Sequence, residues 1–218
     1  MATMTYLELV NGVLRRLREP TVATVTSSDY STLIGDFVND AKVTVENSWD
    51  WTTLRSTISI ATANNVKNYA LTGTGWQGKQ LNVINDTSNW VMEYRTSDWF
   101  DEKYYVEGQA SGAPRYYTFG ETDSNGDQTI DLYPLPDGAY TVRFDAVVRN
   151  APLVNNTDVL EVPWMPVLHL ALALAARERG ETGGTSAQEY FQIAKSLLGD
   201  AIAIDAALHP EDTIFYTP

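Results

Sequence analysis

The chain of 218 residues lacks cysteine and contains only two histidines. The absence of cysteine excludes a disulfide framework, thiolate metal sites and cysteine nucleophiles, so the buried core must supply the stability. His169 and His209 are separated by a helical segment, and neither stands beside a serine in a nucleophile elbow. We expect a packed role for His169 and a helix-end role for His209. We therefore predict no catalytic residue, no metal site and no cofactor.

Positive charge is also scarce. The sequence has 15 Lys and Arg against 28 Asp and Glu, for a formal net charge of -13, and no local block of basic residues offsets this balance. A protein that grips nucleic acid by releasing counterions needs clustered Lys and Arg. Tightly held DNA or RNA is therefore not expected, whereas contact with DNA without adhesion remains open.

Long apolar runs are missing as well. The most apolar stretch, residues 159–176, is interrupted by Glu161, Pro163, Pro166 and His169. Its uninterrupted part is shorter than the roughly 20 residues that a membrane span requires. Residues 1–6 contain neither the basic stretch nor the apolar run of a secretory signal. We predict no membrane partner and synthesis in a cytoplasm.

Helical periodicity is present near both ends of the chain. Apolar residues recur at intervals of three and four, which predicts four amphipathic helices. Thr5 with Glu8, and Ser186 with Glu189, have the spacing of capping boxes at the first and last of them. The periodic segments cover residues 7–17, 34–45, 167–179 and 187–208.

The middle of the chain has a different period. Apolar residues there alternate with Thr and Ser, which favours strands. The Asn125-Gly126 pair and the segment 134–138 have the composition of tight turns, and residues 98–105 predict a short helix. The predicted strands lie within residues 54–60, 66–71, 81–85, 90–94, 115–119, 129–133 and 140–148.

These elements predict an α+β fold. Two helices before the strands and two after them each have an apolar face that must be buried, and packing them together is the simplest solution. The result is a four-helix bundle split between the N- and C-terminal parts, with an inserted antiparallel β domain. We expect a helical pair over residues 1–51, the β domain over 52–150, a second helical pair over 151–209 and a tail over 210–218.

Two motifs match known sites in composition but not in context. Residues 73–78 fit the dinucleotide-binding pattern G-x-G-x-x-G, but a strand follows where that pattern requires a helix, so a glycine-rich turn is expected. Asp123, Asn125, Asp127 and Asp131 resemble a calcium loop, but the glycine precedes the third ligand and no glutamate closes the loop. A hairpin turn is the favoured interpretation, with a weak irregular ion site left open.

Aromatic residues gather around a few carboxylates in residues 90–119. Asp98, Trp99 and Tyr105 are the candidates for a sugar-binding or glycosidase cleft, because such clefts use carboxylates and stacking rings. A β domain of this size also needs aromatic residues in its core, and Asp98 is equally suited to cap the short helix.

The C-terminal segment contains three apolar residues beyond the last predicted helix, Ile214, Phe215 and Tyr216. They either fold back on the protein's own core or dock in a groove of a partner. The sequence leaves both alternatives open.

Several stretches resemble one protein family across nearly the whole chain. They are YLELVN (6–11), LRRL (14–17), EP (19–20), FVNDA (37–41), WDW (49–51), SGAPRYY (111–117), LYP (132–134), PDG (136–138), RGE (179–181), AIDA (203–206) and HPE (209–211). With these, the chain resembles the head-to-tail adaptor, or connector, proteins of tailed and in particular short-tailed bacteriophages, and more distantly tail tubular protein A.

This resemblance implies a structural virion protein at the head-tail interface with no enzymatic step, made in the host bacterial cytoplasm. Its implied partners are the portal protein, a tail or nozzle protein, and further copies of itself in a ring, usually of twelve. DNA would pass through the ring without specific binding, which suits an acidic protein. The tail residues Ile214, Phe215 and Tyr216 would reach the portal. The alternative function is a carbohydrate-binding tail or surface module that uses the aromatic β domain.

Overall fold

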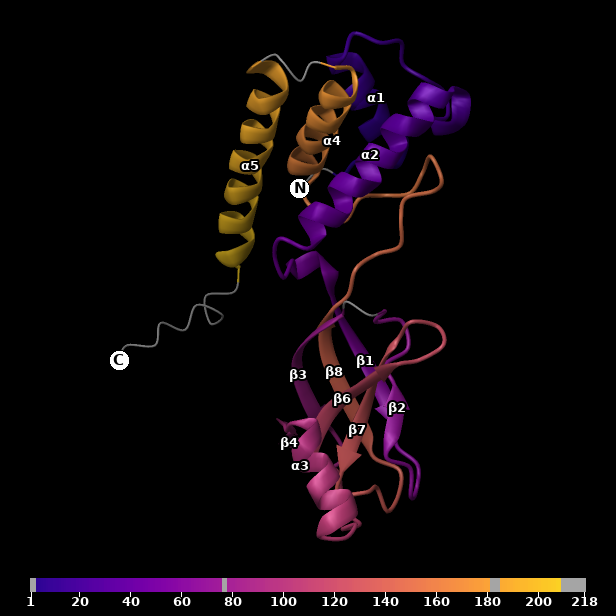
Figure 1. Cartoon of the computed structure of the whole chain (residues 1–218), viewed down its shortest axis with the longest axis vertical. Helices are drawn as coiled ribbons and strands as arrows, with labels where there is room; N and C mark the ends of the chain where they lie inside the picture. Colours follow the sequence, from indigo (N-terminus) through magenta and orange to yellow (C-terminus); the bar gives the residue numbers. More distant parts are fainter. Residues whose placement is uncertain (1–2, 76–77, 181–184, 209–218) are drawn as a thin grey trace, which may run out of the picture. The chain divides into compact units, whose positions relative to one another are not determined.

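The computed structural model describes residues 3–75, 78–180 and 185–208, and the chain divides into two compact units. Met1–Thr53 and Ala151–Pro218 form the helical unit, and Leu54–Asn150 form the β unit (Figure 1). The β unit is thus one continuous segment, whereas both ends of the chain build the helical unit. No helix within the described ranges has the length and apolar character needed to cross a membrane.

All four helices predicted for the helical unit are present, and the fold is of the predicted mixed α+β class. The third predicted helix begins earlier than expected, and the second ends three residues before Trp49. The helices are α1 (Tyr6–Arg16), α2 (Asp29–Glu46), α4 (Trp164–Glu178) and α5 (Thr185–Ala206), with 3-10 turns at Val25–Ser27 and Thr52–Leu54.

The two predicted capping boxes have different outcomes. At α1, the Glu8 backbone N–H donates to Thr5 Oγ1 at 3.3 Å and the Thr5 backbone N–H donates to Glu8 Oε2 at 2.8 Å, so this box is confirmed. At α5, the helix already begins at Thr185, which places Ser186 inside it. The prediction of an N-cap at Ser186 is wrong, because spacing and residue type locate the start of a helix only to within one or two residues.

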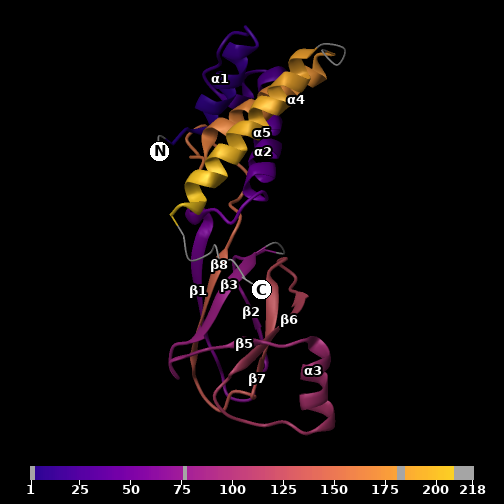
Figure 2. The same cartoon turned by 90° about the vertical axis from the view of Figure 1, so that its left-hand side faces the viewer.

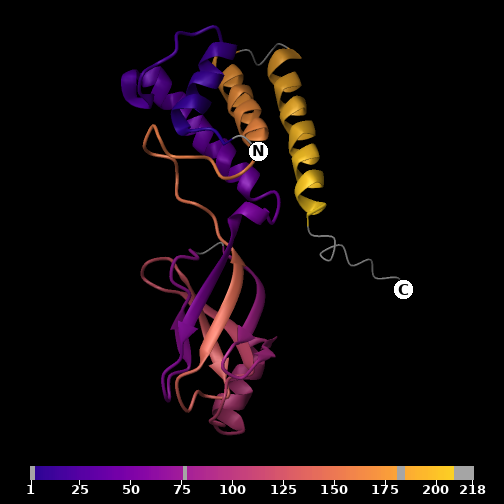
Figure 3. The ribbon, with the colours of Figure 1, turned by 180° about the vertical axis from the view of Figure 1, so that it is seen from behind.

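Helix α4 is the centre of the helical unit. It packs against α1, α2 and α5, and α1 also packs against α2 (Figures 1 and 3). Helix α5 presents Ala187, Ala194 and Ala201 as buried positions at seven-residue intervals. Small residues at this spacing form one narrow stripe, which lets α5 lie close to α4 while its larger apolar residues face other directions.

The closed four-helix bundle that the sequence predicted is not confirmed. A groove remains between α2 and α5, with α4 residues such as Leu170 on its floor. Val45 lines it from α2, and Phe191 and Leu198 line it from α5. Helices α1, α2 and α4 pack against one another, whereas α5 packs mainly on α4 and leaves this groove beside α2.

Polar contacts join the two sequence-distant parts of the helical unit. The Tyr6 backbone N–H donates to Asp158 O at 2.8 Å. The Asn39 side chain accepts from the Leu153 N–H at 2.9 Å and donates to the Leu153 carbonyl at 3.1 Å. Asn156 Oδ1 accepts from the Val25 N–H at 3.0 Å. The segment that leads into α4 is therefore hydrogen-bonded to α1, to α2 and to the turn between them.

The β unit consists of two four-stranded sheets (Figure 2). One sheet has the order β1-β8-β3-β4 and the other the order β2-β7-β6-β5. The strands are β1 (Arg55–Ala61), β2 (Asn68–Ala70), β3 (Lys79–Asn85), β4 (Trp90–Val91), β5 (Glu93–Tyr94), β6 (Tyr116–Thr122), β7 (Gln128–Tyr133) and β8 (Thr141–Val147).

One strand pair departs from the predicted antiparallel arrangement. Strands β5 and β6 pair in parallel, while the other pairs are antiparallel. A parallel pair needs a long crossover connection. Here the connection contains α3 (Ser97–Asp101) and the π-helical turn Glu102–Val106, which together form the predicted short helix. The N-cap of α3 is Thr96, so Asp98 lies in the first turn and does not cap the helix as the sequence suggested.

Apolar residues from both sheets form the main core of the β unit. Phe144 of β8 lies at its centre, and the Tyr117 ring packs against it edge-on at 6.3 Å. The buried members are Leu71, Val83, Met92, Ile130, Leu132, Val142 and Phe144.

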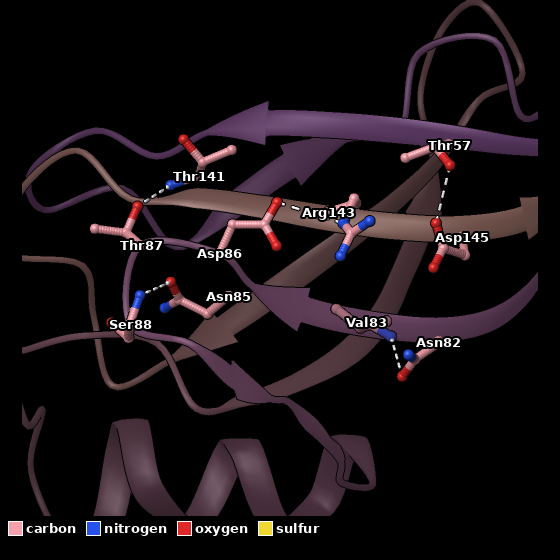
Figure 4. A network of polar contacts seen from close by, with 10 residues as sticks. All are labelled: Thr57, Asn82, Val83, Asn85, Asp86, Thr87, Ser88, Thr141, Arg143 and Asp145. Atoms are coloured by element: carbon pink, nitrogen blue, oxygen red, sulfur yellow. Dashed lines mark hydrogen bonds and ion pairs between the residues drawn. The ribbon is translucent and has the colours of Figure 1, made fainter.

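The other face of the β1-β8-β3 layer is polar (Figure 4). Thr57 Oγ1 donates to Asp145 Oδ1 at 2.9 Å across β1 and β8, and Arg143 Nε lies 3.4 Å from Asp86 Oδ2. Hydroxyl and charged side chains thus alternate with the core residues along β8, as expected for a sheet with one face in solvent.

Candidate interaction surfaces

Trp99 lies in α3 and is part of a second aromatic cluster in the β unit. Its ring is 5.0 Å from Tyr116, 5.3 Å from Tyr133 and 5.4 Å from Phe100. The Lys103 Nζ lies over the same ring at 5.6 Å. Because neighbouring side chains occupy the space around the indole, Trp99 packs α3 onto the sheet and offers little open surface for stacking a sugar.

The other two residues predicted for a sugar site have different surroundings. Tyr105 is 73% exposed in the π-helical turn, with Lys67 Nζ 5.9 Å from its ring. Asp98 is exposed on the first turn of α3. No ring contact joins Tyr105 to Trp99 within the described part of the chain. Tyr105 is therefore the most open ring among the predicted sugar-binding residues.

Tyr104, beside Tyr105 in the sequence, has an internal role. Its hydroxyl donates to the carbonyl of Leu132 on β7. Burial raises the pKa of this phenol, so Tyr104 stays a neutral hydrogen-bond donor. The π-helical turn thus fixes one tyrosine in the core and leaves the next one on the surface.

Hydrogen bonds join the glycine-rich segment to the acidic hairpin. The backbone N–H groups of Gly73 and Gly75 donate to Asp127 Oδ1 at 3.0 and 2.9 Å, and both glycines have a positive φ. Asp123 Oδ1 accepts from the N–H groups of Asn125 and Asp127 at 2.8 and 2.9 Å. The backbone N–H groups that a dinucleotide site would offer to phosphate, and the carboxylate oxygens that a calcium site would offer to the ion, are thus engaged with each other or with neighbouring backbone. The described residues of the glycine-rich segment and the acidic hairpin form turns, as expected from the sequence.

Of the two histidines, His169 lies within the described residues. His169 is half-buried on α4, and its Nδ1 is buried without a hydrogen-bond partner. Burial lowers the pKa of His169, and the nearby Arg16 lowers it further, so the imidazole is neutral at physiological pH. His209 and the tail residues Ile214, Phe215 and Tyr216 lie outside the described residues.

Helix α5 has an apolar outer side. Ile193 and Ile204 of this helix are 44% and 55% exposed, and Leu208, just beyond its end, is 64% exposed. A shallow groove beside Ile204 continues to Leu197 and reaches Met165 at the start of α4. Contiguous exposed apolar surface of this kind is typical of protein contacts.

Five arginines from two distant stretches meet at one end of the helical unit. Arg15, Arg16 and Arg18 lie at the C-terminal end of α1, and Arg177 and Arg179 lie at that of α4. We name this surface the arginine end. All five side chains are exposed.

Arg179 joins the two halves of the arginine end. Its Nε donates to Tyr30 Oη at 2.7 Å, its guanidinium pairs with Glu19, and its Nη1 is 3.4 Å from the carbonyl of Leu17. Its guanidinium also lies 5.0 Å from the Tyr30 ring. These contacts hold the end of α4 beside the residues that follow α1.

The sequence contains no local basic block, and the arginine end is a cluster that forms only when the chain folds. The arginine end is formed by residues more than 150 positions apart, which no window of the sequence can contain. The remaining basic residues of the helical unit are Lys42, which is buried, and Lys195. Positive charge is thus confined almost entirely to one end of this unit.

A comparison with known protein families shows to which family this two-unit chain belongs. The model of the SU10 adaptor protein family matches residues 4–211, which is nearly the whole sequence. The chain belongs to the SU10 adaptor family. This membership agrees with the resemblance found in the sequence and makes the chain a structural adaptor protein of a bacteriophage. No curated protein matched this SU10 adaptor in the comparison.

The match runs through both units of the SU10 adaptor, including α1, the β unit and α5. The match therefore covers both units and is not limited to one motif. Surfaces for protein contact, such as the arginine end and the outer side of α5, are the features in which an adaptor's function is expected to reside.

Proposed function

We propose that the chain is a head-to-tail adaptor that forms a ring of identical copies, binds the portal protein and connects it to the tail. The observation that carries this proposal is the family match over residues 4–211. The exposed apolar side of α5 and the arginine end supply surfaces for contacts with the portal or with other copies.

The negative net charge of the chain supports a role in a channel through which DNA passes. A net charge of -13 repels phosphate, so an acidic ring would let DNA pass into the tail without retaining it. In this proposal the ring, of about twelve copies on the family's pattern, extends the portal channel, and the β unit contacts the tail protein or neighbouring copies.

The test is the native mass of a tagged copy purified from cells that produce the phage particle, together with the identity of every protein that accompanies it. We expect a multi-copy ring with a portal protein. A monomer that brings no portal protein from complete particles would contradict the proposal.

The proposal assigns portal attachment to the C-terminal tail. Deletion of residues 213–218 should leave both units folded and weaken attachment to the portal. The matched control keeps the chain length and replaces Ile214, Phe215 and Tyr216 with alanine, which separates the loss of apolar side chains from the loss of backbone. Co-purification with the portal measures the effect, and unchanged attachment in both variants would assign the contact to another surface.

The alternative function is a carbohydrate-binding module, and the exposure of Tyr105 is the observation that favours it. Tyr105→Ala discriminates between the two functions, because an exposed ring contributes within about 0.5 kcal/mol to stability. We expect the variant to join rings and portal as the unmodified chain does. Saturable glycan binding by the unmodified chain that Tyr105→Ala abolishes would instead support the alternative. Trp99→Ala is a poorer test, because Trp99 also packs α3.

A further inference from the structure

The distribution of charge in the helical unit points to one contact between copies. At the arginine end, Arg15, Arg18 and Arg177 have no ion pair within the described ranges. Arg16 donates to the carbonyl of Gly12 on its own helix at 3.0 Å. Of the acidic residues nearby, Glu19 is already paired with Arg179, and Glu178 is exposed between Arg177 and Arg179. The arginine end thus presents guanidinium groups that can donate hydrogen bonds to a carboxylate.

Helix α2 presents a surface of opposite charge. Asp29, Asp36 and Asp40 are exposed and are spaced by seven and four residues, so they lie along one side of the helix. We name this side the acidic stripe. It faces away from the buried side of α2, which contains Ile34 and Val38.

The acidic stripe has no counter-charge on its own helix. Lys42 is the basic residue of α2, and it is buried with its Nζ 2.8 Å from Glu46 Oε1. Asp36 and Asp40 form no ion pair within the described residues. The stripe is therefore available to a cation from another molecule.

These two surfaces restrict how copies can associate. A two-fold contact could pair the arginine end with the acidic stripe only reciprocally, so that each copy uses both surfaces at once and the assembly ends at a dimer. A contact between the arginine end of one copy and the acidic stripe of the next joins unlike surfaces, and repetition of such a contact can close a ring. Guanidinium groups can bind carboxylates with two parallel hydrogen bonds, which gives the contact a defined geometry.

We propose that the arginine end of one copy binds the acidic stripe on α2 of a second copy. This inference rests on the proposed ring and names the surfaces that join its members.

Cross-linking tests the pairing directly, because the chain has no native cysteine. The double variant Arg15→Cys with Asp36→Cys, assembled on the portal and treated with a short bis-maleimide, should give a ladder of covalently linked copies. The single variants Arg15→Cys and Asp36→Cys should remain uncross-linked. A double variant whose cross-linked product stops at two copies would reveal a reciprocal two-fold contact and overturn the proposal, and so would a covalent dimer from either single variant or cross-linking of Arg15→Cys to the portal alone.

Charge reversal tests the energetic role of the same surfaces. Arg15→Glu with Arg177→Glu should weaken ring formation by about tenfold or more, and so should Asp36→Lys with Asp40→Lys. The combination of all four substitutions restores opposite charges with the polarity exchanged, so it should recover much of the assembly. Recovery also shows that the chain folds with all four substitutions present, so the loss in the single-surface variants is not explained by misfolding.

The matched control is Arg115→Glu, which reverses an exposed arginine outside both surfaces and should weaken ring formation less than either pair of substitutions. Rings that form normally in both single-surface variants would overturn this inference and leave the adaptor function intact. Absence of rings with the unmodified chain would contradict the adaptor function itself, so the two failures are distinguishable. A loss that the four-substitution variant does not recover would also overturn the pairing.

Discussion

Replacement of Leu168 by alanine is expected to lower the free energy of unfolding of the helical unit by about 2 to 5 kcal/mol. Leu168 is 1% exposed on α4, the helix against which α1, α2 and α5 all pack. Removal of its branched side chain leaves a cavity that three neighbouring helices cannot all move to fill. Denaturant unfolding followed by the helical circular dichroism signal measures the loss.

Gly12 on α1 provides a second way to test the same contact. A Cβ atom at position 12 would lie 2.7 Å from Leu168 Cδ1, so Gly12→Ala alone should overpack the interface between α1 and α4. In combination with Leu168→Ala, the new methyl group occupies part of the vacated space. The two substitutions should therefore be less destabilising together than their sum.

Ile193→Ala is the control for the helical unit, because Ile193 is largely exposed on α5. Its cost should stay well below that of Leu168→Ala. Additive effects of Gly12→Ala and Leu168→Ala would contradict direct packing of these two residues. Equal costs for Ile193→Ala and Leu168→Ala would contradict the central position of α4.

The helices were predictable because each one has an apolar period that the sequence displays locally. Their arrangement was not. The position of α5 depends on Ala187, Ala194 and Ala201, whose small size permits close packing but does not name the helix that receives it. Apolar spacing predicted four helices that bury their faces together, whereas α5 packs mainly on α4 and leaves a groove beside Phe191.

The β unit shows a similar limit. Alternation located the strands, and the Asn125-Gly126 turn was confirmed by the positive φ of Gly126. The parallel pairing of β5 with β6 depends on the crossover through α3, which is a matter of connection and not of strand composition. Asp127 shows the same dependence, because its two glycine partners lie more than 50 residues earlier in the chain.

The interaction surfaces were the least predictable part. Trp99, Tyr105 and Asp98 were chosen because they are close in sequence, yet the structure packs Trp99 among other rings and leaves Tyr105 exposed. The arginine end escaped detection for the opposite reason, since its two halves meet only after the chain has folded. A charge count over sequence windows reports the acidic average and misses a cluster assembled from two helix ends.

The second large effect is expected in the β unit, where Phe144→Ala should lower the free energy of unfolding by about 3 to 5 kcal/mol. Phe144 is 0% exposed on β8, which pairs with both β1 and β3. Its ring fills the space between the two sheets and packs edge-on against Tyr117. Alanine would leave a cavity at the point where the sheets are held together.

Hydrogen exchange at the backbone amides of β3 and β8 measures this effect, because opening of the β unit exposes those amides to solvent. Exchange in Phe144→Ala should be faster by a factor that corresponds to the lost stability. Val91→Ala on the short edge strand β4 is the control, since Val91 is 61% exposed and its truncation removes little buried surface. Unchanged exchange in β8 of Phe144→Ala would mean that contacts other than those of Phe144 hold the two sheets together. The Tyr117 ring would then be the first of these contacts to test by substitution.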